Sequence, residues 1–306
     1  MTDFIAPDAV INVRKLSRKY WRKEALNTVS ITVTPGVVYG LVGENGAGKT
    51  TLLKHIIGRL RARSGRVRVF GLDPIKNPVA VLSRLGYLSE DRDIPGWMRV
   101  GEAMRYTRAF YAGWDESYAV SLRERFELDE RAKIKTLSRG EKAKCGLLLA
   151  LSYRPALLVL DEPSSGLDPS ARRDILEAIV RTVADEGRTV LFSSHLLDEV
   201  ERVADVVALM HQGKVVFEES LESIKARHVR LLVSCAEVDT VIPNLPGLLQ
   251  VIGGGRERTL VCEGELESLQ TSAISCGLKV LDISRPSLEE VFLARIAPTN
   301  KKERAS

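Results

Sequence analysis

A glycine-rich stretch is the first part of the chain whose residue types and spacing could do chemistry. It reads Gly43-Glu44-Asn45-Gly46-Ala47-Gly48-Lys49-Thr50-Thr51 and fits G-x-x-x-x-G-K-S/T between a predicted strand (Val37 to Val42) and a helix predicted from Lys49. Glycines let backbone N–H groups turn inward around an anion, and the helix adds the positive end of its dipole. Lys49 is then placed to reach the β- and γ-phosphates of a nucleotide, and Thr50 to offer a hydroxyl to Mg²⁺. A plain glycine-rich turn is the weaker interpretation because a strand and a helix flank the motif.

Two carboxylates follow another apolar segment. Leu157 to Leu160 is predicted to be a buried parallel strand, and Asp161 and Glu162 come at its carboxyl end. Ligands of open α/β sheets bind at that edge. Asp161 is placed to hold Mg²⁺ through water, and Glu162 to orient or deprotonate the water that attacks a γ-phosphate. The alternative is that the pair only caps the turn that begins at Pro163.

A histidine follows a third apolar segment. Thr189 to Phe192 is predicted to be a strand, and Ser193-Ser194-His195 comes after it. A lone histidine in this position is usually structural. Together with the two earlier strands, His195 becomes a candidate sensor of the γ-phosphate.

A fourth stretch identifies a class of nucleotide-binding protein. Leu137-Ser138-Arg139-Gly140-Glu141 precedes a helical run from Lys142 to Leu151 and resembles the signature motif of ABC ATPases. The resemblance covers residues 8 to 225. It implies ATP and Mg²⁺ as cofactors, Tyr20 as the aromatic that stacks on adenine, and Ser165-Gly166-Leu167-Asp168 as the loop that links two active sites.

The signature also predicts a protein partner. Ser138 and the N–H groups from Gly140 onward form a helix N-terminus, which attracts anions. In the family this site faces the γ-phosphate held by the P-loop of a second subunit. Because the chain has one P-loop and one signature, we expect a homodimer, or a heterodimer with another ABC ATPase.

Three positions depart from the usual family pattern. Glu90, in Leu88-Ser89-Glu90, stands where many members have glutamine, and it could still reach the Mg²⁺ or its water. Arg139 replaces the second glycine of the signature; it could add a cation toward a phosphate or point to solvent. Glu141 stands where glutamine is common. None of the three removes a group that the chemistry needs.

Composition indicates a globular, cytosolic protein. The 306 residues suit a domain of about 220 residues and a smaller one. No apolar stretch is long enough to span a membrane, and Met1 to Asp8 lacks the features of a signal peptide. The four cysteines are scattered, so neither a disulfide framework nor a zinc site is expected.

The net charge of +5 lies entirely before Ala226, since ten Lys/Arg and ten Asp/Glu follow from there. A visible basic run comprises Arg59, Arg61, Arg63, Arg66 and Arg68. It is either a solvated face or a surface for anionic lipid headgroups, and we do not expect nucleic acid as a partner.

The predicted fold class is α/β: a P-loop NTPase of the ABC ATPase type with three additions. Residues 1–225 are expected to form the ATPase domain, with a small antiparallel β subdomain near its start and a helical subdomain at about 94–151. Residues 226–297 are expected to form a small α+β domain of a ferredoxin-like kind, and 298–306 a disordered tail.

Aromatic residues gather in the helical subdomain: Trp97, Tyr106, Phe110, Tyr111 and Trp114. They either belong to its core or line a groove beside Glu90, which in the family receives a short helix of a membrane-embedded partner.

The resemblance implies a cytoplasmic ATP-hydrolysing subunit, peripheral on the inner face of the cell membrane, that powers export through a separate polytopic membrane subunit docked near Glu90 and the helical subdomain. Pro286 to Leu293 resembles the carboxyl-terminal extension of such bacterial exporters. The alternative is a soluble ABC ATPase acting on ribosomes or nucleic acid. That class typically joins two ATPase halves or inserts coiled coils or zinc modules, and the sequence has none of these.

Overall fold

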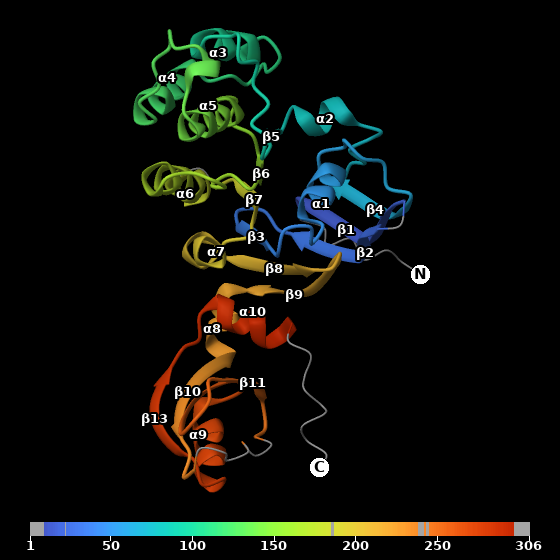
Figure 1. Cartoon of the computed structure of the whole chain (residues 1–306). Helices are drawn as coiled ribbons and strands as arrows, with labels where there is room; N and C mark the ends of the chain where they lie inside the picture. The colour runs from blue at the N-terminus through green and yellow to red at the C-terminus, as the bar shows by residue number, and fades with distance from the viewer. Residues whose placement is uncertain (1–8, 22, 185–186, 238–241, 243–244, 297–306) are drawn as a thin grey trace. The chain divides into compact units, whose positions relative to one another are not determined.

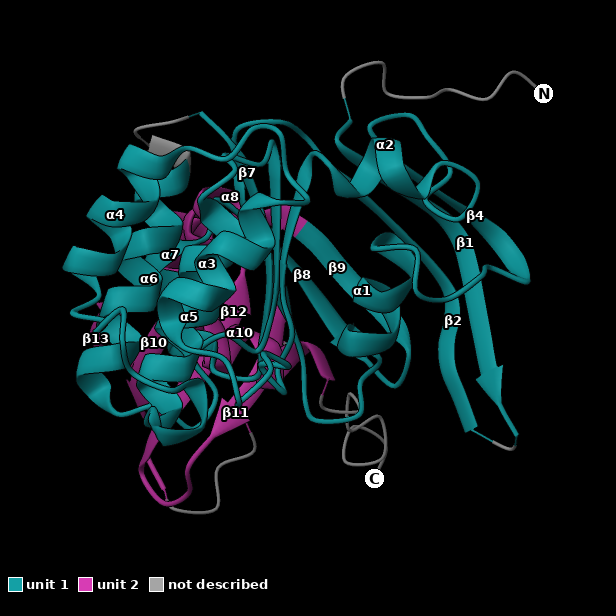
Figure 2. Cartoon of the chain, turned by 90° about the horizontal axis from the view of Figure 1, so that it is seen from above, with its two compact units in different colours: residues 1–218 teal, residues 219–306 magenta. Residues whose placement is uncertain are grey.

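The computed structural model describes residues 9–21, 23–184, 187–237, 242 and 245–296, so the expected disordered tail lies outside the described residues. The chain forms two compact units, Met1–Glu218 and Glu219–Ser306 (Figure 2). The sequence-based boundary after residue 225 falls inside helix α8 (Leu221–Arg227), which packs on strand β10 (His228–Ser234) of the second unit.

A six-stranded sheet is the centre of the first unit. Its order is β5 (Leu85–Leu88), β6 (Leu157–Asp161), β7 (Thr189–Ser194), β3 (Val38–Val42), β8 (Val206–His211) and β9 (Lys214–Ser220). The strands from β5 to β8 in this order are parallel. Every residue of β3, β6 and β7 is buried, as expected for parallel strands covered on both faces. Helices α6 (Pro169–Ala184) and α7 (Leu197–Val203) lie on one side of the sheet and α1 (Lys49–Ile56) on the other (Figure 1).

A second, antiparallel sheet stands beside α1. Its order is β2 (Lys23–Val33), β1 (Ile11–Tyr20) and β4 (Ser64–Val69), and α2 (Pro78–Leu82) follows it in the chain. Ile11 pairs with Val33 on one side and with Val69 on the other, and all three join the core that also contains Leu41 of β3. This shared core fixes the β subdomain against the P-loop strand.

The helical subdomain contains α3 (Val100–Arg108), α4 (Glu116–Arg125), a short 3₁₀ turn (Ile134–Thr136) and α5 (Arg139–Leu151). Helix α5 begins three residues before the apolar periodicity indicates. The cause is local: Ser138 is its N-cap, so the signature forms the first turn of the helix.

The second unit is an antiparallel sheet with helices. The sheet order is β11 (Leu248–Ile252), β12 (Glu257–Glu263), β10 and β13 (Lys279–Ser284). This is the ferredoxin-like order, and α9 (Leu266–Ser275) is the described crossover helix between β12 and β13. Helix α10 (Leu288–Ile296) follows, and its Glu290 forms an ion pair of 3.2 Å with Arg230 of β10. The predicted fold class, with its β subdomain, helical subdomain and α+β domain, is confirmed.

In the parts of the chain that the structure describes, no helix has both the length and the apolar character needed to cross a membrane.

Candidate active site

The predicted chemical groups meet at one edge of the central sheet. Strands β3, β6 and β7 are parallel neighbours through β7, so their carboxyl ends lie together. The P-loop follows β3, Asp161 ends β6 and Glu162 follows it, and His195 comes directly after β7. The parallel topology therefore brings together residues that are more than a hundred positions apart in the chain.

Glycine is required in the P-loop for two measurable reasons. The backbone of Gly48 has φ of 109°, a left-handed value that other residues rarely adopt, and a Cβ there would lie 2.4 Å from the carbonyl oxygen of Ala25. A Cβ on Gly43 would lie 2.3 Å from the carbonyl oxygen of Met210. Any side chain at either position would displace the loop from the sheet.

Lys49 is buried at the centre of the site. Its side chain is 5% exposed, and its Nζ donates a hydrogen bond of 2.5 Å to the carbonyl of Gly43. The same Nζ lies 3.0 Å from Oε1 of Glu162. A buried ammonium is stable only when it is paired and hydrogen-bonded, and both conditions hold here.

Thr50 and Asp161 form the oxygen pair expected for a magnesium site. The Thr50 hydroxyl donates to Oδ1 of Asp161 at 3.2 Å, and the Ser193 hydroxyl donates to the same oxygen at 2.8 Å. Burial raises the pKa of Asp161, and the charge of Glu162 adds to the rise, while the bonds from Ser193 and Thr50 and the charge of Lys49 oppose it. A divalent cation beside Asp161 would relieve this penalty. One carboxylate and one hydroxyl also suit Mg²⁺, which takes most of its remaining ligands from water and phosphates.

Glu162 has the geometry of a held base. Its Oε2 lies 2.7 Å from Nδ1 of His195, and its backbone N–H donates to the Ser193 hydroxyl at 2.9 Å. Its backbone φ is +48°, a strained value for a residue with a side chain, and such strain gathers at functional sites. His195 uses Nδ1 for Glu162, which leaves Nε2 to face a ligand.

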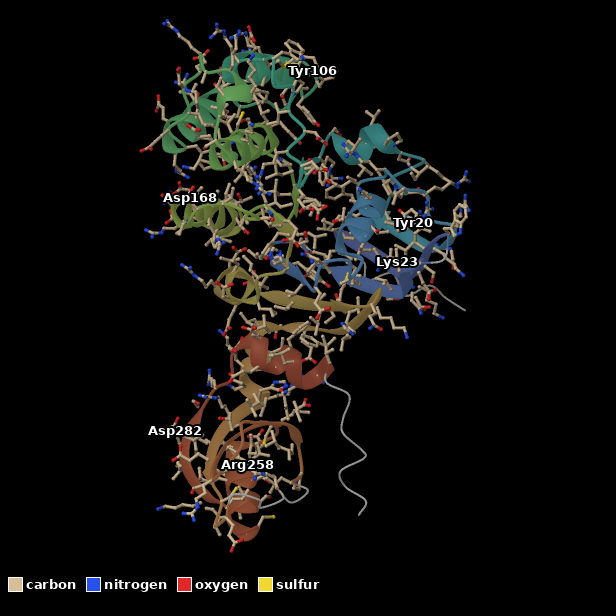
Figure 3. The ribbon with its side chains drawn as sticks, viewed as in Figure 1. Tyr20, Lys23, Tyr106, Asp168, Arg258 and Asp282 are labelled. Atoms are coloured by element: carbon tan, nitrogen blue, oxygen red, sulfur yellow. The ribbon has the colours of Figure 1, made fainter. Side chains whose placement is uncertain are left out.

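Tyr20 is the last residue of β1 in the β subdomain, and Lys23 is the first residue of β2 (Figure 3). The ring of Tyr20 is partly exposed, and the guanidinium of Arg18 lies over it at 4.7 Å from the ring centroid. Lys23 is a cation that the sequence did not single out. Its Nζ lies 3.5 Å from the point where a Cβ on Gly46 would stand, so its charge lies beside the P-loop.

Ser138 and Glu141 of the signature form a capping box, in which the side chain of each accepts a hydrogen bond from the backbone N–H of the other. The Ser138 hydroxyl accepts from the N–H of Glu141 at 3.2 Å, and Oε2 of Glu141 accepts from the N–H of Ser138 at 2.7 Å. These hydrogen bonds hold the pKa of Glu141 below its ordinary value. The acidic residue that replaces the family's glutamine is thus the second half of the cap.

Arg139 packs on the loop after β6. A Cβ on Gly166 would lie 2.3 Å from Nη1 of Arg139, so this exposed side chain lies against the Gly166 turn, and a contact with a phosphate remains a prediction. Asp168, in the same loop, accepts hydrogen bonds from the N–H groups of Ser170 and Ala171 and thereby caps α6. Gly140 lies close to this turn, since a Cβ there would be 2.8 Å from that of Ala171.

Glu90 has no described contact with the two carboxylates. It is exposed in the turn after β5, and the hydrogen bonds and ion pairs of the described residues do not join it to Thr50 or Asp161. Within the described ranges, no cluster of three His, Cys, Asp or Glu side chains could hold a metal by itself. A magnesium ion here would therefore depend on Asp161, Thr50 and a bound nucleotide, with Glu90 remaining a prediction.

Three further residues, Ser193, Glu199 and Arg92, support the site and were not predicted. Ser193 bridges Asp161 and the backbone of Glu162, and it lies opposite Asp161 in the β6–β7 register. Glu199, only 1% exposed, accepts from Ser164 and Ser194 and pairs with Arg172 at 3.1 Å. Arg92 donates to the carbonyl of Ser165 at 3.0 Å. The position of Ser193 after an apolar strand was a usable signal, whereas the others depend on tertiary contacts.

The aromatics of the helical subdomain divide into two groups. Tyr111 is partly buried and stacks on the buried Tyr153, with ring centroids 3.7 Å apart. Trp97, Tyr106 and Phe110 are 72%, 56% and 68% exposed, so the core interpretation is wrong for these three. Tyr106 and Phe110 also contact each other, with ring centroids 5.0 Å apart, which makes a continuous apolar surface on α3 and the turn after it.

Comparisons with known proteins agree with the geometry. Residues 26–165 match the family model described as ABC transporter. The chain is 30% identical to a daunorubicin resistance ATP-binding protein of Streptomyces coeruleorubidus, with 94% of this chain and 95% of that protein covered. It is 31% identical to a bacitracin transport ATP-binding protein of Enterococcus faecalis, with 72% of each covered. A solved structure of the ATP-binding subunit of an ABC transporter is similar with a TM-score of 0.65 and 29% identity, over 71% of this chain and 92% of that one.

Proposed function

The chain belongs to the family of ABC transporter ATP-binding proteins, and from this premise we propose that it hydrolyses ATP to drive export of a substrate through a separate membrane subunit. The observation that supports ATP hydrolysis is a chain of side-chain contacts: Lys49 contacts Glu162, and Glu162 contacts His195. Lys49 binds the anion, Glu162 receives the proton and His195 holds the base, as the reaction requires.

The pairing of Lys49 with Glu162 suggests how nucleotide binding prepares the base. The β- and γ-phosphates carry more negative charge than one carboxylate, so they compete for Nζ of Lys49. Transfer of Nζ to the phosphates releases Oε1 of Glu162, which can then accept a hydrogen bond from water. The hydrogen bond to His195 keeps the carboxylate in place meanwhile.

Hydrolysis then needs one proton transfer. The water oxygen bonds to the γ-phosphorus, the bond from that phosphorus to the β–γ bridging oxygen breaks, and Glu162 accepts the water proton. Nε2 of His195 is placed to donate to the γ-phosphate. Thr50 and Asp161 would hold a Mg²⁺ that enters with the nucleotide, and such an ion would supply positive charge at the phosphate oxygens.

A second protomer is needed because the signature is exposed. Ser138 and Arg139 are exposed, and the described contacts of residues 138–141 do not reach the P-loop of the same chain. We propose a head-to-tail dimer in which this helix N-terminus contacts the γ-phosphate bound by the partner. The partner is a second copy or another ABC ATPase.

The exposed aromatic surface of α3 supports docking of a polytopic membrane subunit there. Trp97 and Tyr106 present large apolar rings to solvent, as anchors of protein interfaces do. The chain would thus be cytoplasmic and peripheral to the membrane through this contact. Export is favoured because the relatives are named for drug resistance and for bacitracin or lantibiotic transport. A soluble role on ribosomes or nucleic acid has no such support.

Two substitutions test the docking proposal in cells and in vitro. Trp97→Ala or Tyr106→Ala should abolish transport and co-purification with the membrane subunit, while hydrolysis by the isolated protein stays near normal. Ile274→Ala, which removes a similarly exposed apolar side chain in the second unit, is the control. Unchanged transport in both aromatic variants would reject this docking surface.

A further inference from the structure

A strongly basic pair of hollows lies on the first unit beside the β subdomain. The smaller has a volume of about 390 Å³ and is lined in part by His55, Arg61, Arg66 and Arg68. The larger, of about 590 Å³, shares Arg61 and adds Arg18 and Arg63. Seven cationic side chains line the two hollows together against one carboxylate, Asp73, whereas the entire chain has a net charge of only +5.

Buried polar groups at these hollows lack partners. His55 is 1% exposed, and neither of its ring nitrogens makes a hydrogen bond of good geometry within the described structure, although an interaction with the backbone of Leu60 favours its protonated form. Nε of Arg18 is also buried without a partner. Buried donors left in this state are destabilising, and they are usually satisfied by water or a ligand.

The arrangement exceeds what helix α1 needs at its end. His55 and Lys54 lie in the last turn of α1, where the helix dipole supplies about half a negative charge. Lys54 alone already exceeds this charge. Arg18 on β1 and Arg61 and Arg63 in the loop between α1 and β4 repel one another, whereas Arg68 of β4 pairs with Asp73 at 3.1 Å. A multivalent anion would relieve the repulsion among the first three.

The hollows are distinct from the site already described, which comprises the P-loop, Asp161, Glu162 and His195 and which we call the cradle. Helix α1 runs from Lys49 in the P-loop to Ile56, and its eight residues separate the two places by about 12 Å at 1.5 Å per residue. Arg18 lines the larger hollow, and its guanidinium lies over the ring of Tyr20.

We propose that these hollows form a second anion site, which binds a phosphate group through Arg18, His55 and Arg61. The planar guanidinium of arginine can donate two parallel hydrogen bonds to phosphate oxygens, and a protonated imidazole adds a further N–H donor. The group comes from a soluble phosphate compound or from the headgroup of an anionic phospholipid, and its chemistry at the site is the same.

The imidazole of His55 provides a local readout. Burial lowers the pKa of His55, and the charge of Arg18 lowers it further. A bound phosphate favours the protonated ring and should raise that pKa toward its ordinary value. Because the chain has four histidines, the His55 signal can be assigned by NMR with His55→Gln.

The experiment titrates the full chain with pyrophosphate while saturating Mg-ADP fills the P-loop. The His55 signal should move, and Arg61→Ala should weaken binding about tenfold or more, as loss of one charge-assisted contact predicts. Arg63→Ala provides a second variant. Arg173→Ala, which removes one exposed arginine of α6, should bind as the wild type does.

A vesicle arm distinguishes the source. If vesicles of phosphatidylglycerol and phosphatidylcholine bind in an Arg61-dependent way and pure phosphatidylcholine does not, the ligand is a lipid headgroup; a response to pyrophosphate alone indicates a soluble phosphate. Either result supports the site. No movement of the His55 signal with either probe, or equal weakening by Arg61→Ala and Arg173→Ala, would overturn it.

Discussion

The P-loop cradle and the signature segment differ in how far one chain completes them. In the cradle, Lys49, Asp161 and Glu162 are at most 5% exposed and touch one another or Ser193. In the signature, Ser138 and Arg139 are exposed, and their contacts serve helix α5 and the loop at Gly166. The groups of the cradle thus contact one another within one protomer, whereas the signature is an exposed surface, which the proposed dimer would place against a second protomer. Figure 3 shows Asp168 and Tyr20 on opposite sides of the central sheet.

The largest effect is expected in the cradle. Glu162→Gln keeps the shape of the side chain but removes its ability to take a proton, so turnover should fall about 10²- to 10⁴-fold while ATP binding remains. Phosphate release and equilibrium nucleotide binding measure the two parts. Asp198→Asn is a matched control, since it changes an exposed carboxylate three residues from His195. Near-normal turnover by Glu162→Gln would place the base elsewhere.

A complementation test addresses the division between the two regions. Lys49→Ala disables the cradle and Ser138→Arg blocks the signature, so each variant alone should be inactive. Mixing them allows one intact composite site in a mixed dimer, and about a quarter of wild-type activity should return if copies pair at random. Failure to recover any activity would contradict a site shared between copies of this chain.

Removing the cap separates a structural role of the signature from a role in binding. Ser138→Ala loses the bond from the Glu141 N–H and should destabilise the first unit by about 1 kcal/mol. Ser220→Ala removes the equivalent cap of α8, where the hydroxyl accepts from Ser223 at 3.1 Å. Both variants should lower stability in denaturant melts, but Ser138→Ala alone should weaken ATP-dependent association. If the two variants associate equally well with ATP, Ser138 acts only as a helix cap and not in binding.

The cradle could largely be predicted from sequence because its groups follow apolar strands directly. Parallel pairing brings the ends of β3, β6 and β7 to one edge, so Lys49, Asp161 and His195 meet without further information. The contacts of Glu199 and Arg92 could not be predicted. Each depends on how a loop folds back in three dimensions, and Arg92 adopts a φ of +52° that its sequence does not announce.

The signature shows the opposite limit. Its sequence predicts the helix N-terminus, but the location of Arg139 depends on the approach of the Gly166 turn, which is a long-range contact. The exposure of Trp97 and Tyr106 could not be predicted from the sequence either, because aromatic residues have the same helical spacing on a core face and on a docking face.

The smallest effects concern stability, and they have opposite signs in the two regions. Burial raises the pKa of Asp161, so the ionised carboxylate opposes folding. Stability contributed by this group is present below the ordinary pKa of aspartate and is lost as pH rises through the raised value. Asp161→Asn should therefore raise the melting temperature at pH 7 by about 2 to 4 °C, the shift for about 1 kcal/mol, while turnover is lost. The gain should vanish near pH 4.

Asp168, on the signature side, should behave in the reverse way. Hydrogen bonds from the N–H of Ala171 and then Ser170 lower its pKa, so its stability is present at neutral pH and is lost as pH falls through the lowered value. Asp168→Asn should thus lower the melting temperature at pH 7 slightly, and the difference from wild type should shrink in acid. Calorimetric melts of both variants from pH 2 to 8 should give two curves that approach the wild type in acid from opposite sides. If both variants change the melting temperature in the same direction, burial does not destabilise the ionised carboxylate of Asp161. The predicted difference between the cradle and the helix cap at Asp168 would then be wrong.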